Sequence, residues 1–475
     1  MSCTRPLSTS AHRPSVGSTA ASTASSSERR SSVTGRRGYQ LGSTGVLVIR
    51  GGDVVDEHGR RRGDVAVDDG SVVAVAPSID PPAGATVLDA SGCLVTPGLV
   101  DLHVHLRQPG GEEAETVETG SRGAALGGFT AVVAMPNTTP AQDDVEVIRA
   151  VRRWAAEADL CDVHPSAAIT VGRAGERLVD FVALHAAGVR IFTDDGNEVA
   201  DAALMRAAFE ACLPLPGAVL GQHAECASLV CDGHLHEGAV SAALGLGGRP
   251  AAAEEITVAR DLALLRLTGG RLHVLHASCA TTAALVRAAK AEGLRVTMEV
   301  TPQHLVLTDA ACAAGDPTFK VNPPLRPGSD VDALRLALAD GTVDAIATDH
   351  APHAPHTKAR PFADAPPGML GLETAVGVAL TTVVGGGHAS LETVLGALSW
   401  RPARIAGMTD QGRPVAPGEP ANLCVIDPEA RWKVDAAMMA SRSRNSPFAG
   451  WDLRGRVRHT LRRGEPVVLD GTAQR

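Results

Sequence analysis

The chain has 475 residues, of which 44% are hydrophobic, enough for the buried core of one large domain and one smaller one. Its formal net charge of −9 disfavours a nucleic-acid partner, and no apolar run approaches the length of a membrane span. The nine cysteines are odd in number, scattered and without a Cys-x-x-Cys pair. This pattern is typical of reduced thiols, and we expect a cytoplasmic protein without membrane attachment.

Residues 1–41 are rich in Ser, Thr, Ala and Arg and carry six arginines against a single acid, Glu28. Such a composition cannot form a packed core, so we expect a disordered tail. It also resembles an organellar transit peptide, but we favour a basic extension or an upstream translation start. The rest of the chain is then more acidic than the whole.

Both ends of the remaining chain predict antiparallel strands. Short apolar alternations over 46–49, 64–67 and 71–75 are separated by Gly, Asp and Pro turns, and strands are again predicted over 418–426, 456–460 and 466–469. We therefore expect segments 42–95 and 411–475, the latter with a short C-terminal tail, to combine in one small β-sandwich domain.

Segment 96–410 repeats a different unit, in which a buried strand ends in polar residues and an Ala- and Leu-rich helical stretch follows. Eight such units predict an α/β fold of the TIM-like (β/α)8 barrel type, with its active site at the carboxyl ends of the strands. The strands are expected near 93–105, 130–135, 163–169, 189–193, 218–223, 272–276, 295–300 and 343–348.

The first of these strands carries a metal-binding pattern. His103 and His105 are two residues apart, so both side chains point to the same side of the strand, and Arg107 follows in the same register. Neutral imidazole is a common zinc ligand. A second pair, His234 and His236, follows no apolar strand, and we interpret it as loop chemistry.

The other strand ends add ligand-type residues. Four histidines and two aspartates exceed what one tetrahedral zinc needs, so two ions that share a bridging carboxylate are expected. None of the four lysines lies where a carboxylated bridging lysine would be needed, which leaves Asp194 or Asp195 as the bridge. One ion is then assigned to His103, His105 and Asp349, and the other to His223 and His276.

This set of residues predicts amide hydrolysis. Metal binding lowers the pKa of water to about 7, and an ion can polarise a carbonyl group. Asp349 is the natural proton carrier between water and a departing nitrogen. Arg107, Asn137 and His353 remain, and a guanidinium beside such donors favours a substrate carboxylate.

From about residue 45 to its C-terminus the chain resembles the class I dihydroorotases of bacteria, within the amidohydrolase superfamily. The motifs that carry the resemblance are D-L-H-V-H-L-R-Q-P-G-G (101–111), M-P-N-T (135–138), F-T-D-D-G (192–196), N-P-P-L-R (322–326), A-T-D-H-A-P-H (347–353) and P-G-M-L-G-L-E-T-A (367–375). Together they are highly specific.

The resemblance implies two zinc ions bridged by Asp195 and reversible cyclisation of N-carbamoyl-L-aspartate to L-dihydroorotate, a step of pyrimidine synthesis. It implies Asp349 as the catalytic acid and base. The implied metal ligands are His103, His105, Asp195, His223, His276 and Asp349. The implied substrate contacts are His105, Arg107, Asn137, Asn322, His353, Pro367 and Gly368.

Two alternatives stay open. A hydantoinase, dihydropyrimidinase or allantoinase would share the barrel, although such relatives usually use a bridging lysine. A non-catalytic scaffold for aspartate carbamoyltransferase would usually lack several ligands. We also expect a homo-oligomer, and the resemblance leaves open a complex with aspartate carbamoyltransferase. Segment 356–366 is either a mobile loop over the site or a solvated connector.

Overall fold

The computed structural model describes residues 45–475. The tail expected over 1–41 lies outside the described residues. Within the described part, no helix combines the length and the apolar character needed to cross a membrane. The described residues form a β/α barrel and a β-sandwich domain built from both ends of the chain, as the sequence predicted.

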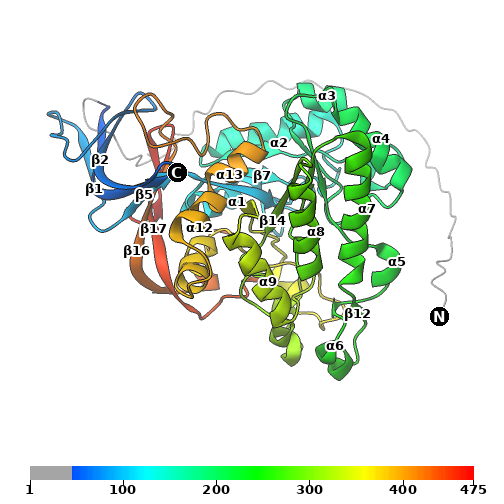
Figure 1. Ribbon diagram of the computed structural model, residues 1–475. Helices are drawn as coiled ribbons and strands as arrows, with labels where there is room; N and C mark the ends of the chain where they lie inside the picture. The colour runs from blue at the N-terminus through cyan, green and yellow to red at the C-terminus, as the bar shows by residue number, and fades with distance from the viewer. Residues whose placement is uncertain (1–44) are drawn as a thin grey trace, which may run out of the picture. The chain divides into compact units, whose positions relative to one another are not determined.

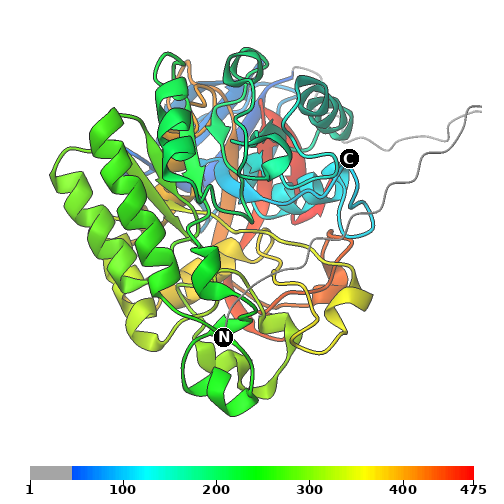
Figure 2. The same ribbon diagram turned by 90° about the vertical axis from the view of Figure 1, so that its right-hand side faces the viewer.

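The β-sandwich domain is one nine-stranded sheet in which β5 and β16 join the two chain ends, with Val95 opposite Val425. Blue strands from the first end and red strands from the second lie side by side in Figure 1, and Figure 2 shows them together again. Apolar residues from both ends share one core, so neither end can bury its apolar face alone. The strands are β1 (Leu47–Asp56), β2 (Gly59–Asp68), β3 (Ser71–Ala76), β4 (Thr86–Asp89), β5 (Leu94–Pro97), β16 (Leu423–Lys433), β17 (Asp452–Arg462), β18 (Glu465–Leu469) and β19 (Thr472–Ala473).

The barrel contains eight parallel strands in two ladders, β6-β7-β8 and β9-β10-β13-β14-β15. Single parallel bridges, Ala167 to Phe192 and Val104 to His350, join the two ladders into a ring. The strands are mostly apolar and buried, as parallel strands covered by helices must be. They are β6 (Leu99–Val104), β7 (Phe129–Ala134), β8 (Asp162–Pro165), β9 (Ile191–Phe192), β10 (Val219–Gln222), β13 (Leu272–Val274), β14 (Val296–Val300) and β15 (Ala345–Ile346).

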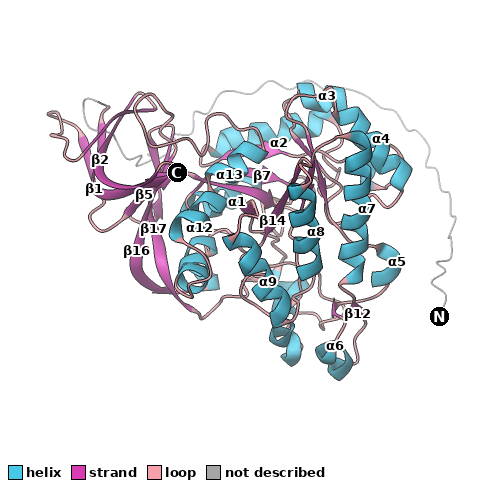
Figure 3. Ribbon diagram, in the orientation of Figure 1, coloured by secondary structure: helices cyan, strands magenta, loops and turns pink. Residues whose placement is uncertain are grey.

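Helices surround these strands, as the cyan ribbons outside the magenta arrows in Figure 3 show. Several begin at an aspartate whose carboxylate accepts backbone N–H groups of the first turn, as Asp144, Asp180 and Asp201 do. The α-helices are α1 (Val117–Leu126), α2 (Val145–Ala158), α3 (Phe181–Ala186), α4 (Ala202–Cys212), α5 (Ala227–Val230), α6 (Ala239–Leu244), α7 (Ala252–Thr268), α8 (Ala280–Ala291), α9 (Gly328–Ala339), α10 (Pro355–Lys358), α11 (Ala375–Val378), α12 (Leu391–Leu398) and α13 (Trp400–Ile405). Short helices η1 (Val171–Arg173), η2 (Asp309–Ala314), η3 (Pro317–Phe319), η4 (Ala379–Val384) and η5 (Ala436–Met438) and the small pair β11 (Leu235–His236) and β12 (Gly248–Arg249) complete the fold.

The strand predicted over 93–105 is two strands. β5 belongs to the β-sandwich domain and β6 to the barrel, and only Gly98 separates them. A Cβ atom on Gly98 would lie 2.1 Å from Oγ1 of Thr130 on β7, so the chain can pass here only without a side chain. An apolar run in the sequence cannot reveal this change of sheet.

The C-terminal part also contributes to the barrel. Between β16 and β17 the chain leaves the sheet and packs against the mouth of the barrel, where Phe448 is buried beside Met369 and Leu370. Ser441 donates a hydrogen bond to Glu115 (2.5 Å), and Ser443 donates one to the carbonyl of Ala114 (2.8 Å). Part of the segment predicted as β-sandwich therefore shapes the barrel mouth.

Candidate metal centre and substrate cavity

The structure brings the six predicted metal ligands together at the carboxyl ends of the barrel strands. His103 lies on β6 and His105 directly after it, and the others follow β9, β10, β13 and β15 within three residues of the strand end. All six are buried. They are His103, His105, Asp195, His223, His276 and Asp349.

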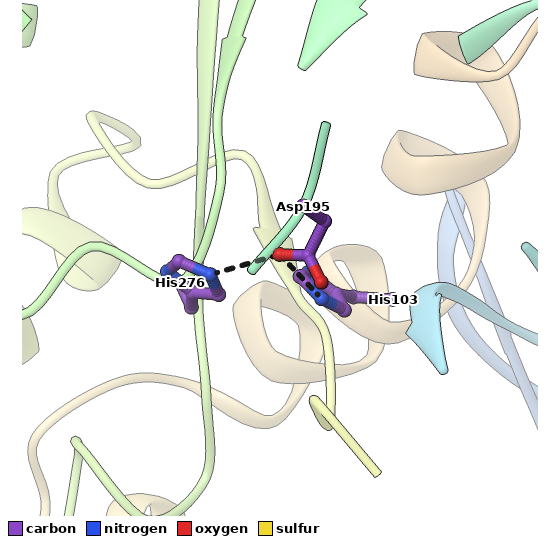
Figure 4. Close-up of side chains that lie close together, drawn as sticks. All are labelled: His103, Asp195 and His276. Carbon is purple, nitrogen blue, oxygen red and sulfur yellow. Dashed lines mark hydrogen bonds and ion pairs between the residues drawn. The ribbon is translucent and has the colours of Figure 1, made fainter. Parts of the chain in front are cut away.

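Asp195 lies at the centre of this group. Its Oδ1 is 3.3 Å from Nε2 of His103 and 3.3 Å from Nε2 of His276, the two contacts drawn in Figure 4. The same oxygen lies 3.5 Å from Nδ1 of His223, and its Oδ2 lies 3.6 Å from Nε2 of His105. One carboxylate thus faces four imidazoles from three different strand ends, β6, β10 and β13, an arrangement that suits a bridge between two ions. By contrast, Asp194 points away.

Asp349 approaches the group from the other side. Its Oδ1 lies 3.0 Å from Nε2 of His105 and 3.6 Å from Nε2 of His103. His103 belongs to both candidate metal-binding groups, one with Asp195 and His276 and one with His105 and Asp349. In each group the ligand atoms lie within 4.8 Å of one another. Two neighbouring cation sites are therefore compatible with this geometry.

Both carboxylates are held ionised. Burial raises the pKa of Asp195, but the surrounding imidazoles, His103 foremost, outweigh it and hold the pKa well below its usual value. For Asp349, burial again raises the pKa, and the hydrogen bond from His105 and the nearby imidazoles lower it further than burial raises it. Two anionic ligands among four imidazoles suit a divalent ion.

His103 provides a direct test of metal fit. Its Nδ1 lies 2.8 Å from Oε1 of Glu299, so a neutral ring donates its proton there. Its Nε2 is buried and has no hydrogen-bond partner among the described residues, although it lies between Asp195 and Asp349. A buried nitrogen with a free lone pair is costly unless it binds something, and the donor set suits a metal ion.

A cavity of about 230 Å³ opens beside these ligands. Every predicted site residue lines it except His103, which lies beneath the floor with no exposed surface. The lining residues are His105, Arg107, Asn137, Asp195, Gly196, His223, His276, Asn322, Asp349, Ala351, His353, Pro367 and Gly368.

Arg107, which is half-buried, supplies a positive charge to this cavity. Burial lowers its pKa to about 10, which leaves the guanidinium charged at neutral pH. Its Nε donates to the carbonyl of Pro352 at 3.1 Å, and its two terminal nitrogens have no hydrogen-bond partner within the described part of the chain. Two donors are thus available to a carboxylate.

His353 and Gly368 form the opposite wall. Nε2 of His353 lies 2.8 Å from the carbonyl oxygen of Pro367, and burial lowers the pKa of His353 to about 3, so the ring is neutral. Gly368 donates its N–H to the carbonyl of Lys320 (2.8 Å). A Cβ atom at Gly368 would lie 2.8 Å from both Ala351 and His353, so the two segments touch at this point.

The two asparagines each contact a predicted ligand. Asn137 Oδ1 accepts a hydrogen bond from His105 Nδ1 (2.8 Å), and its Nδ2 lies 3.5 Å from Asp195. Asn322 Nδ2 lies 3.2 Å from Nε2 of His223, the ring nitrogen that faces away from Asp195. Both asparagines therefore orient an imidazole while they line the cavity.

The second His-x-His pair has basic partners instead. Lys320 Nζ lies 3.3 Å from Nδ1 of His234, and Arg326 Nη1 lies 3.1 Å from Nδ1 of His236. A nitrogen that accepts a hydrogen bond from a cation is not available to a metal ion. This agrees with the interpretation of the pair as loop chemistry.

Two residues near the site were missed from the sequence. Glu299 is fully buried in β14 and joins His103 to His273, whose Nε2 lies 3.0 Å from its other oxygen. The only signal was one acid inside an apolar strand. Asn445 bonds to the backbone of Ala351 and Gly368 in the cavity wall, yet lies 94 and 77 residues beyond them in the chain, and no motif marks it.

Comparisons with known proteins agree with this geometry. A family model described as "Dihydro-orotase-like" matches residues 92–281. A dihydroorotase of Mycobacterium bovis is 50% identical over 412 residues, which cover 86% of this chain and 96% of that protein. A dihydroorotase of Streptomyces coelicolor is 48% identical over 89% of this chain and 98% of its own. The chain belongs to the dihydroorotase family.

Solved structures place this dihydroorotase-family chain on a shared amidohydrolase fold. An L-hydantoinase (dihydropyrimidinase) from Arthrobacter aurescens superposes with a TM-score of 0.80 at 26% identity, over 90% of this chain and 97% of that one. A D-hydantoinase has a TM-score of 0.78 at 24% identity and supports the fold alone. The predicted family and fold are confirmed, and the chain is a cyclic amide hydrolase.

Proposed function

We propose that this protein is a zinc-dependent dihydroorotase of the cytoplasm, which interconverts N-carbamoyl-L-aspartate and L-dihydroorotate plus water in pyrimidine synthesis. The observation that carries the proposal is Arg107, a half-buried cation with two unpaired donor nitrogens among the described residues, in the same cavity as the metal-ligand group. The ring of dihydroorotate bears a carboxylate that this guanidinium would bind. Hydantoin and allantoin rings bear none.

The proposed metal centre holds two zinc ions. His103, His105 and Asp349 would hold one, His223 and His276 the other, and Asp195 would bridge them. When bound, the ions lower the pKa of water to about 7 and polarise the amide carbonyl. The unpartnered Nε2 of His103 supports this assignment.

The protein's own groups would then orient the substrate and move its proton. Arg107 would hold the ring carboxylate, with Asn137, Asn322 and His353 as further contacts and the backbone at Pro367 and Gly368 as the wall. His105 would contact the substrate as well as the metal. Asp349 is ionised in the free enzyme, so it would accept a proton from water and deliver it to the leaving ring nitrogen.

The test is an assay of the purified full chain on dihydroorotate, hydantoin and allantoin, with zinc content measured in parallel. We expect turnover of dihydroorotate far above that of the other two, and loss of that turnover after chelation of zinc. A preference for hydantoin or allantoin would overturn the assignment. A folded protein that binds no metal and stays inactive after zinc is supplied would instead indicate a scaffold.

Replacing Arg107 by Gln tests the carboxylate contact. Hydrogen bonds to charged groups contribute about 1.5–3 kcal/mol each, so we expect KM for dihydroorotate to rise about 10- to 100-fold. Dihydrouracil, which is the same ring without the carboxylate, is the control substrate. Its slow turnover should be unchanged, and an equal loss on both substrates would contradict a carboxylate contact.

Replacing Glu299 by Gln tests the support of the metal ligand His103. The amide keeps the shape of the side chain but offers one acceptor to two imidazoles, so we expect zinc affinity to fall about 10- to 100-fold in a chelator competition assay. Glu254→Gln changes another buried glutamate, bonded to Ser278, and should lower the melting temperature without this loss. Equal zinc affinities in both variants would contradict the role of Glu299.

Two expectations concern partners. The sequence resemblance predicts a homo-oligomer and leaves open a complex with aspartate carbamoyltransferase. Light scattering of the purified chain, alone and mixed with that enzyme, measures both.

A further inference from the structure

Asn445 lies where the C-terminal part of the chain reaches the barrel mouth. It follows η5, precedes β17, and is only 5% exposed. Its backbone carbonyl accepts a hydrogen bond from the N–H of Leu370 at 3.1 Å. The residue is therefore fixed against the segment that follows Gly368.

The side chain of Asn445 joins two segments of the cavity wall. Its Nδ2 donates to the carbonyls of Ala351 and Gly368, each at 3.0 Å, and its Oδ1 accepts the N–H of His353 at 3.2 Å. This uses both donors and the acceptor of one amide. An aspartate of the same shape would place an oxygen against two carbonyl oxygens.

A second contact reinforces the same wall. Lys358 Nζ donates to the carbonyls of Pro366 (3.0 Å) and Gly368 (3.1 Å), the second of which also accepts from Asn445. Because Gly368 and Ala351 are in contact, their separation determines where the His353 ring lies relative to Pro367. Asn445 is bonded to both Ala351 and Gly368 and so fixes the distance between them.

We propose that Asn445 is a positioning residue, whose amide fixes the spacing of 351–353 and 367–370 and thereby places His353 and Gly368 against the substrate. The inference rests on the proposed function for the identity of that substrate. Asn445 lines no part of the cavity and acts through the residues it holds. It links the C-terminal segment to substrate affinity.

The test compares Asn445→Asp with Asn422→Asp in the full chain. Asn422 is a matched control: it is 3% exposed, and its amide also bonds to backbone, at Asp410 and Arg463, near the amino end of β6. We expect Asn445→Asp to raise KM for dihydroorotate about tenfold or more, which corresponds to about 1.4 kcal/mol, with zinc content unchanged, because the carboxylate would repel the carbonyl oxygens of Ala351 and Gly368. Asn422→Asp should lower the melting temperature and leave KM unchanged.

Hydrogen exchange supplies a readout that needs no turnover. Amides in 351–354 and 367–370 should exchange faster in Asn445→Asp than in the wild type, and should not in Asn422→Asp. If Asn445→Asp folds poorly, the milder Asn445→Ser should show the same faster exchange. Unchanged exchange in these segments, or a KM no higher than that of the control at equal loss of stability, would overturn the inference. An inactive wild-type enzyme with the expected exchange pattern would overturn the proposed function but not the role of Asn445 in holding 351–353 and 367–370.

Discussion

Asp195→Asn is expected to reduce turnover by more than about 100-fold and to release at least one of the two proposed ions. Replacing a residue that only supports a metal ligand lowers metal affinity or activity about 10- to 100-fold. Asp195 is itself a proposed ligand and faces four imidazoles, so we expect a larger loss. The neutral amide would also lose the negative charge shared between the ions. Metal analysis and the dihydroorotate assay measure the two effects together.

Its neighbour provides the control. Asp194 accepts hydrogen bonds from the N–H groups of Ile169 (2.8 Å) and Thr170 (3.0 Å) and from the hydroxyl of Thr170. Asp194→Asn should therefore cost about 1–3 kcal/mol of stability and keep both ions. Similar, mild losses of activity in the two variants would refute Asp195 as the bridge.

Asp349→Asn is expected to separate metal binding from proton transfer. The amide oxygen can still act as a ligand, but the side chain can no longer accept and release a proton, so kcat should fall about 10²- to 10⁴-fold. Zinc content and KM should change little. Asp344→Asn, before β15 and paired with Lys290 at 2.6 Å, is the control at the opposite end of the strand. Retention of more than a tenth of kcat in Asp349→Asn would contradict the proposed acid and base role.

Most residues of the candidate site could be predicted from the sequence because they directly follow barrel strands. His103 and His105 are neighbours in the sequence. Asp195 and Asp349 follow other strands of the barrel, and parallel strands bring their carboxyl ends to the same edge. What could not be predicted depends on contacts between strands and loops. Glu299 matters only because β14 places it beside His103, and Asn445 only because the C-terminal segment returns to the barrel mouth.

Segment 356–366 illustrates the same limit. The sequence left a mobile loop and a solvated connector equally open. In the structure two buried lysines bond to its backbone: Lys320, from outside the segment, donates to the carbonyls of Phe362 and Ala363, and Lys358, within it, donates to that of Pro366. The segment is therefore bonded through its backbone at Phe362, Ala363 and Pro366, while His356, Arg360 and Asp364 are exposed.

Gly98 joins the β-sandwich domain directly to the barrel strand that carries His103. Pro97 ends a strand held by the two chain ends, and five residues beyond Gly98 stands His103, with no loop between them to absorb a displacement. A barrel cut away from the β-sandwich domain would lose β5, the strand that fixes the start of β6 and so the position of His103. The first metal-ligand candidate is thus joined to the sheet of the β-sandwich domain by a single residue, so we expect its position to depend on that domain.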